Sequence, residues 1–149
     1  MYSTGSQINS LPKLESVGGS LHLYTTSIKD LGDLKYVGGD LNIRRTQIES
    51  LGNLKSVGGN LDLAYSQIKT LGNLESVGGL LDLYNTPIES LGNLESVGGS
   101  LNLRNTPIES LDDLKYVGNH LYLKNTPLSK TTTEEEIRKQ ITVKGNILL

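Results

Sequence analysis

The chain has 149 residues, with 14 lysines and arginines against 16 aspartates and glutamates, and it contains no cysteine. This length is typical of one domain with its own core. The near balance of charge argues against a protein that binds nucleic acid or an anionic membrane. Without cysteine there is no disulfide, thiolate metal ligand or thiol nucleophile. Trp and Phe are also absent, so the core must be aliphatic.

The N-terminal segment MYSTGSQINS has neither the basic region nor the apolar stretch of a secretory signal. No apolar run approaches the roughly 20 residues of a transmembrane helix. Together with the lack of cysteine, these features predict a cytoplasmic protein.

A unit of 20 residues recurs without insertion from Ile8 to Leu128. Its clearest copy is the segment 80–99, LLDLYNTPIESLGNLESVGG. A fixed period of this kind predicts a solenoid, in which stacked coils bury the apolar face that no single coil covers. The aliphatic positions of the clearest copy are Leu81, Leu83, Ile88, Leu91, Leu94 and Val97.

The spacing of the apolar residues changes within the unit. The segment 81–83 alternates apolar and polar residues, which predicts a short half-buried strand. Ile88, Leu91 and Leu94 are then spaced by three, which predicts a coiled or 3₁₀-like return path. The expected fold class is an α/β-type solenoid dominated by β, with one parallel sheet of about six to seven short strands.

Two glycine columns mark the corners of the coil. A Gly-Gly pair precedes each predicted strand, and Asn119 replaces the second glycine in one copy. Because Asn tolerates left-handed backbone, we expect positive φ at the second position of the pair. The other column begins at Gly32 and aligns with Pro12 and Asp112. Since proline holds φ near about −65°, this position is expected to need no positive φ and to begin a tight turn.

A hydroxyl column lies three residues after each predicted strand core. Such hydroxyls can bond the backbone of their own or the adjacent coil. Because no base repeats beside them, a structural ladder is favoured over a set of nucleophiles. The column comprises Thr26, Thr46, Ser66, Thr86, Thr106 and Thr126.

The two ends differ from the middle. At the N-terminus, Ser3 stands where a core leucine is expected. Near the C-terminus, Thr133 followed by three glutamates is a capping-box signature, and it predicts a helix over about 133–142. The single solenoid 1–149 is therefore divided into a degenerate first coil (1–19), regular repeats (20–128) and a C-terminal cap (129–149) that ends in a strand at 147–149.

The pattern LxxLxxVGGxLxLxxTxIxxL resembles the leucine-rich repeat superfamily from Ile8 to Leu128. Two features depart from it: the ladder residue is Thr rather than Asn or Cys, and Leu101 follows Val97 by four positions rather than three. In both respects the chain is more similar to the L domains of growth-factor receptors and to small bacterial or viral proteins of this type. The lack of cysteine is unlike a receptor ectodomain.

The resemblance implies a right-handed solenoid with a parallel sheet, used for protein recognition, and no catalytic residue. For a viral protein, the expected location would be the host cytoplasm.

The outward strand positions vary between copies, whereas the inward leucines hardly change. Exposed Tyr and Arg dominate binding hot spots, so we expect this face to bind a partner protein; an ordinary hydrated sheet face is the alternative. The predicted binding residues are Tyr24, Arg44, Asp62, Tyr65, Asp82, Tyr84, Arg104, Tyr122 and Lys124.

Two other functions stay open. Asp62 and Asp82 are expected to be neighbours flanked by Asn42 and Asn102, so they could bind a cation or act as acid and base, although a flat row does not wrap a cation. The apolar strand 147–149 could pair between chains, which predicts a homodimer or an assembly role. The favoured interpretation is a non-enzymatic scaffold with no metal and no cofactor.

Overall fold

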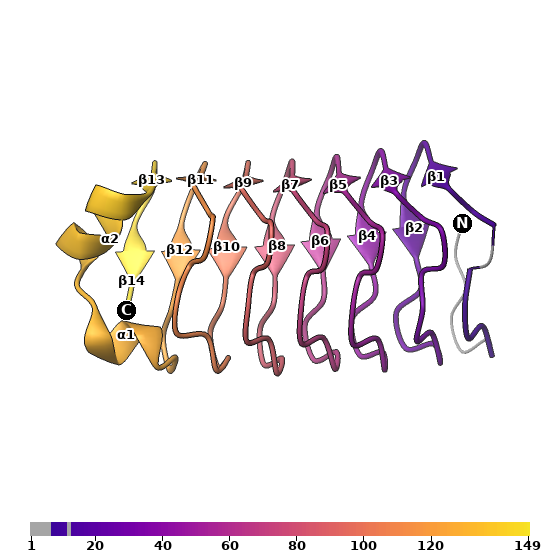
Figure 1. The fold of residues 1–149 in the computed structure, drawn as a ribbon, viewed down its shortest axis with the longest axis horizontal. Helices are drawn as coiled ribbons and strands as arrows, with labels where there is room; N and C mark the ends of the chain where they lie inside the picture. Colours follow the sequence, from indigo (N-terminus) through magenta and orange to yellow (C-terminus); the bar gives the residue numbers. More distant parts are fainter. Residues whose placement is uncertain (1–6, 12) are drawn as a thin grey trace.

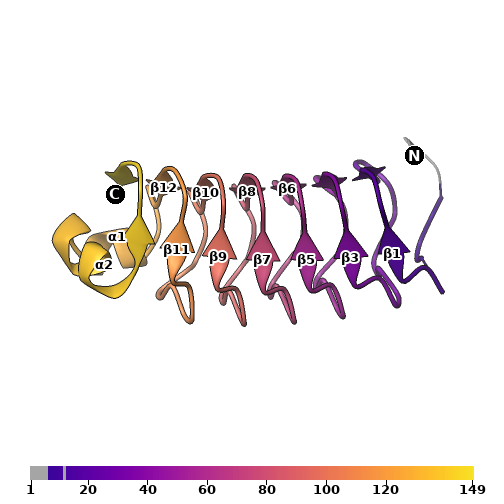
Figure 2. The same ribbon diagram turned by 90° about the horizontal axis from the view of Figure 1, so that it is seen from above.

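A computed structural model describes residues 7–11 and 13–149. The chain is a β-solenoid whose short strands form two parallel sheets on adjoining sides of an aliphatic core (Figures 1 and 2). Each sheet has seven strands within the described residues. The expectation for Ser3 in the first coil lies outside the described residues.

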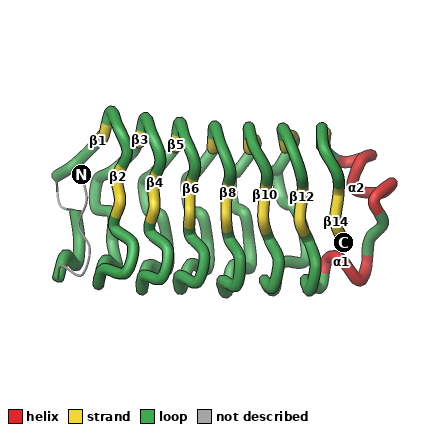
Figure 3. The backbone as a smooth tube through the Cα atoms, turned by 180° about the vertical axis from the view of Figure 1, so that it is seen from behind, coloured by secondary structure: helices red, strands yellow, loops and turns green. Residues whose placement is uncertain are grey.

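The first sheet, here the leucine sheet, carries the predicted strands and confirms the expected strand number. Its strands stack exactly one repeat apart, so that Leu81 pairs with Leu61 on one side and Leu101 on the other. Figure 3 shows this sheet facing the viewer. It comprises β2 (Leu21–His22), β4 (Leu41–Asn42), β6 (Leu61–Asp62), β8 (Leu81–Asp82), β10 (Leu101–Asn102), β12 (Leu121–Tyr122) and β14 (Ile147–Leu148).

The second sheet, here the valine sheet, was not predicted. Part of the return path is the expected tight turn, since the amide of Leu94 donates to the carbonyl of Leu91 at 3.2 Å. The path then becomes a strand, because the β-branched valines stack in register from coil to coil. This sheet comprises β1 (Ser16–Val17), β3 (Tyr36–Val37), β5 (Ser56–Val57), β7 (Ser76–Val77), β9 (Ser96–Val97), β11 (Tyr116–Val117) and β13 (Thr142–Val143).

The core is the stack of aliphatic columns. All six aliphatic positions of the clearest copy are fully buried, and each such side chain contributes about 1.5–3 kcal/mol of hydrophobic stabilisation. The hydroxyl column lies at the border of this core. The hydroxyl of Thr86 donates to the carbonyl of Leu83 in its own coil at 2.8 Å, and Thr126 makes the same bond to Leu123. The threonines of the column therefore have the predicted structural role, whereas the buried hydroxyl of Ser66 has no hydrogen-bond partner.

Both predictions for the glycine backbone are wrong. The Gly-Gly pairs do not have positive φ, whereas Gly92 has a φ of 58° and Asp112 keeps a φ of 48° in the same column. The pairs serve close packing instead: a Cβ on Gly78 would overlap the carbonyl oxygen of Gly58 in the preceding coil. Pro12 lies outside the described residues.

The C-terminal cap contains two helices, α1 (Leu128–Thr131) and α2 (Glu134–Gln140), which lie together at one end of the solenoid (Figures 1 and 3). Helix α2 confirms the predicted helix and its capping box, with Thr133 as N-cap. It ends at Gln140 because Ile141 is extended and leads into β13. Within the described residues, neither helix is long and apolar enough to cross a bilayer.

Candidate functional site

The polypeptide turns away from the leucine sheet at a corner that follows each strand. We call its two outward residues the exit corner of that coil. The second residue of every exit corner has positive φ, between 54° and 63°. The exit corners are Tyr24–Thr25, Arg44–Arg45, Ala64–Tyr65, Tyr84–Asn85, Arg104–Asn105 and Lys124–Asn125.

Aromatic and arginine side chains from four neighbouring exit corners and from strand β12 form one continuous row. The guanidinium carbon of Arg104 lies 5.5 Å from the ring centroid of Tyr84 and 5.2 Å from that of Tyr122. Each such contact contributes about 0.5–1 kcal/mol at an exposed site. Tyr84 meets Tyr65 edge to face, with ring centroids 5.3 Å apart, and Arg45 lies over Tyr65 at 5.4 Å. We call these five residues the Tyr/Arg row.

The row unites four of the predicted binding residues, Tyr65, Tyr84, Arg104 and Tyr122, and adds Arg45. The sequence offered a signal for Arg45, because it stands one repeat before Tyr65 in the same column.

The remaining predicted cations and Tyr24 lie along the same edge. Tyr24 lines a shallow depression with Arg44 and Arg45, while Lys124 is exposed at the other end of the edge.

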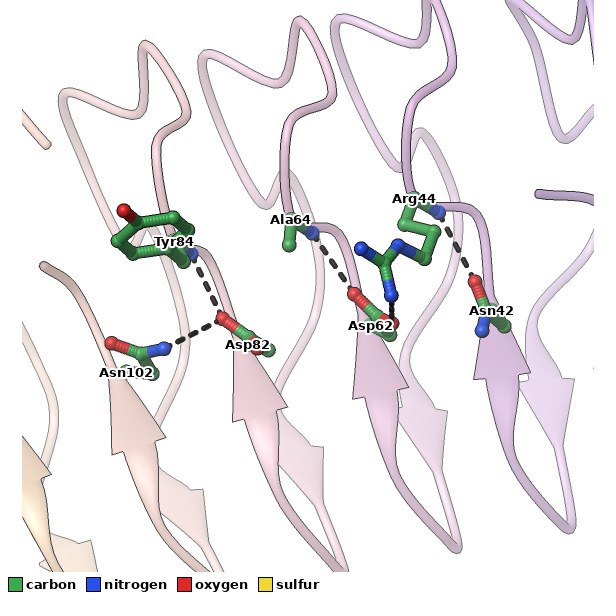
Figure 4. A network of polar contacts seen from close by, with 7 residues as sticks. All are labelled: Asn42, Arg44, Asp62, Ala64, Asp82, Tyr84 and Asn102. Carbon is green, nitrogen blue, oxygen red and sulfur yellow. Dashed lines mark hydrogen bonds and ion pairs between the residues drawn. The ribbon is translucent and has the colours of Figure 1, made fainter. Parts of the chain in front are cut away.

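Asp62 and Asp82 have a structural role that sequence reasoning missed (Figure 4). The Oδ1 atom of Asp62 accepts a hydrogen bond from the amide of Ala64 at 3.1 Å, and that of Asp82 accepts one from Tyr84 at 2.9 Å. The Oδ1 atom of Asn42 likewise accepts a hydrogen bond from the amide of Arg44. These Asx turns end strands β4, β6 and β8 and direct the chain into the exit corner.

The two aspartates differ in their side-chain partners. Asp82 also accepts from the side-chain amide of Asn102 at 2.9 Å, whereas Asp62 forms an ion pair with Arg44 at 3.9 Å. Burial raises the pKa of Asp62, and the charge of Asp82 adds to this; the Ala64 amide and Arg44 oppose it. Within the described residues, no group of three or more His, Asp or Glu side chains could hold a metal ion.

A second polar ladder runs along the residues that immediately precede the strands of the leucine sheet. Each side chain accepts from the backbone amide one repeat later, as Asp40 does from Asn60 and Asn60 does from Leu80, both at 2.7 Å. Leu80 has no acceptor and interrupts the ladder, and its side chain is 37% exposed. It borders a depression of about 230 Å³ on the sheet face.

The outer surface of the return path carries rows in which lysines and glutamates of neighbouring coils form ion pairs. Lys69 pairs with Glu49 at 3.1 Å and Lys115 with Glu95 at 2.9 Å, each joining neighbouring coils. Exposed pairs of this kind contribute little to stability. They provide a matched control surface for experiments on the Tyr/Arg row.

No protein-family model matches the sequence, and the comparisons with curated proteins and with solved structures found no match. The function is therefore inferred from the chemistry of the surface.

Proposed function

We propose that the protein is a non-enzymatic scaffold that binds a partner protein through the outward face of the leucine sheet. The Tyr/Arg row is the observation that carries this proposal. Tyrosine and arginine are the side chains most enriched in interface hot spots, and here they are gathered across five neighbouring coils. The Tyr65 residue is 41% exposed to solvent.

The row is also preorganised for binding. Arg104 is held between two tyrosine rings, and its Nε donates to Asn102 at 3.0 Å. A side chain already fixed in the free protein loses less conformational entropy when a partner binds. The row therefore offers contact area at a low ordering cost.

The resemblance to leucine-rich repeats supports the same function, because that superfamily recognises proteins with its parallel sheet. We propose a right-handed, leucine-rich-repeat-like winding and a cytoplasmic location, in a host cell if the protein is viral. Because one fold can serve many functions, the solenoid fold by itself identifies no binding site.

Assembly through the solenoid ends is a second candidate function. Leu148 and Leu149 are each 42% exposed at the C-terminal end of the leucine sheet, and β14 pairs only with β12 among the described strands. An exposed strand edge with apolar side chains favours pairing between chains. Under this alternative, light scattering would show dimers that Leu148→Lys removes.

A pull-down with matched variants tests the leading proposal. We expect the double variant Tyr84→Ala/Arg104→Ala to retain at least about tenfold less of the partner protein than the wild type does. Its melting temperature should fall by no more than about 4 °C, because both side chains lie at the surface.

The control variant Lys69→Ala/Glu49→Ala changes the charged outer rows and should retain the partner. Equal retention by both double variants would contradict a role for the sheet face.

A further inference from the structure

All the charged side chains at the exit corners are positive. Their twelve positions hold four cations and no aspartate or glutamate, although the whole chain has a net charge of −2. Among the described residues, Arg44 is the one of these cations that forms an ion pair with a carboxylate, and its Nη1 lies 3.9 Å from Asp62. The cations are Arg44, Arg45, Arg104 and Lys124.

The backbone of the exit corners favours asparagine. Later coils place Asn85, Asn105 and Asn125 at the position of positive φ, and the amide of Asn125 donates to Asn105 at 2.8 Å. Asparagine tolerates this left-handed conformation, whereas larger side chains are strained in it.

Arg45 and Tyr65 occupy the same position with φ of 54° and 60°. The fold does not require these residues there, so their strain points to a role outside the fold.

We infer that the row of exit corners binds an acidic, extended segment of the partner protein. This inference rests on the proposed protein-binding function and specifies the partner's chemistry. Carboxylates would pair with the guanidinium groups of Arg44, Arg45 and Arg104 and with the Lys124 ammonium. Alternate side chains of an extended peptide are about 7 Å apart, whereas neighbouring coils are about 4.8 Å apart. Two such peptide steps, about 14 Å, span the three coils from Arg45 to Arg104, so a segment lying along the solenoid axis can present acidic groups to both arginines.

The geometry favours a protein segment over a single-stranded nucleic acid. Binding of single strands relies on bases that stack on open aromatic faces. Here Arg104 covers a face of Tyr84 and of Tyr122, and Arg45 covers a face of Tyr65.

A fluorescent peptide with the sequence (Glu-Ser)₅ tests the inference. In about 20 mM salt we expect it to bind the wild-type protein at least about tenfold more tightly than (Gln-Ser)₅, and to weaken as the salt rises to about 200 mM. Equal binding of the two peptides, or tighter binding of a ten-nucleotide oligothymidine, would overturn the inference.

The double variant Arg45→Asn/Tyr65→Asn tests the role of the strained residues. Because asparagine suits this backbone, the melting temperature should stay equal or rise by roughly 2–4 °C, while affinity for (Glu-Ser)₅ falls by about fivefold or more. A lower melting temperature with unchanged peptide binding would show that Arg45 and Tyr65 act in the fold instead.

Competition separates this inference from the proposed function. We expect (Glu-Ser)₅ to displace the partner retained in the pull-down. If it fails while Tyr84→Ala/Arg104→Ala still abolishes retention, protein binding stands and the acidic segment is wrong.

Discussion

Each of the strands β2, β4, β6, β8, β10 and β12 lies between two corners that obey different rules. The Gly-Gly pair before the strand, here the glycine corner, is nearly identical in every coil, although its φ angles are not positive. The exit corner after the strand has positive φ at its second residue in every coil, yet that residue is Thr, Arg, Tyr or Asn.

The difference shows that crowding constrains sequence more strictly than backbone strain does in this molecule. At the glycine corner an added Cβ would meet backbone atoms of the preceding coil, which cannot move without breaking the stack. At the exit corner the side chain of the second residue is exposed, or half-buried at Asn105, so a strained residue costs free energy without blocking the fold. Functional variation is therefore expected at the exit corner.

The substitution Gly78→Ala should have the largest effect, because it places a Cβ against the carbonyl oxygen of Gly58. We expect a loss of about 2–3 kcal/mol in the free energy of unfolding, measured by urea denaturation.

Gly18→Ala is the matched control, since a Cβ at Gly18 meets nothing within 4 Å. Similar losses in the two variants would show that crowding does not explain the glycine corner.

The substitution Ser66→Thr should stabilise the protein by about 1 kcal/mol. Ser66 is the one described residue whose buried side-chain oxygen has no hydrogen-bond partner, whereas Thr86 in the next coil donates to Leu83. Threonine adds a buried methyl group and orients the hydroxyl toward the Leu63 carbonyl. Thermal unfolding measures the gain, and a lower melting temperature would mean that this coil has no room for the methyl group.

The substitution Asp62→Asn should have the smallest effect, and it should depend on pH. The pKa of Asp62 is raised above 3.8, chiefly by burial, so its ionised form is less favourable in the folded than in the unfolded chain. The penalty is absent at low pH and develops as the pH rises through the raised pKa.

Asparagine keeps the oxygen that accepts from Ala64 and removes the charge. At pH 7 we expect a gain below about 0.5 kcal/mol, because solvent screens the site. The gain should vanish near pH 3, where aspartic acid is neutral; an equal difference at both pH values would exclude this cause.

The repeat columns predicted the coil, the leucine sheet, the buried hydroxyl ladder and the capping helix, because each depends on patterns local to one unit. The valine sheet was missed because its two-residue strands arise from stacking between coils, which no single unit displays. The glycine backbone was predicted wrongly for the same reason: Gly78 is required by Gly58, a residue one coil away.

The candidate site was predicted as rows of varied residues, and stacking does bring Tyr65, Tyr84, Arg104 and Tyr122 together. The Asx-turn role of Asp62 and Asp82 was missed, although aspartate and asparagine at a strand end are a local signal for such turns.

The most direct test of the binding face is an NMR titration of the isotope-labelled protein with the partner retained in the pull-down. We expect the amide shifts to concentrate at the exit corners 44–45, 64–65, 84–85 and 104–105. Shifts confined to the charged outer rows around Glu49 and Lys69, or to the terminal strand 147–148, would contradict it.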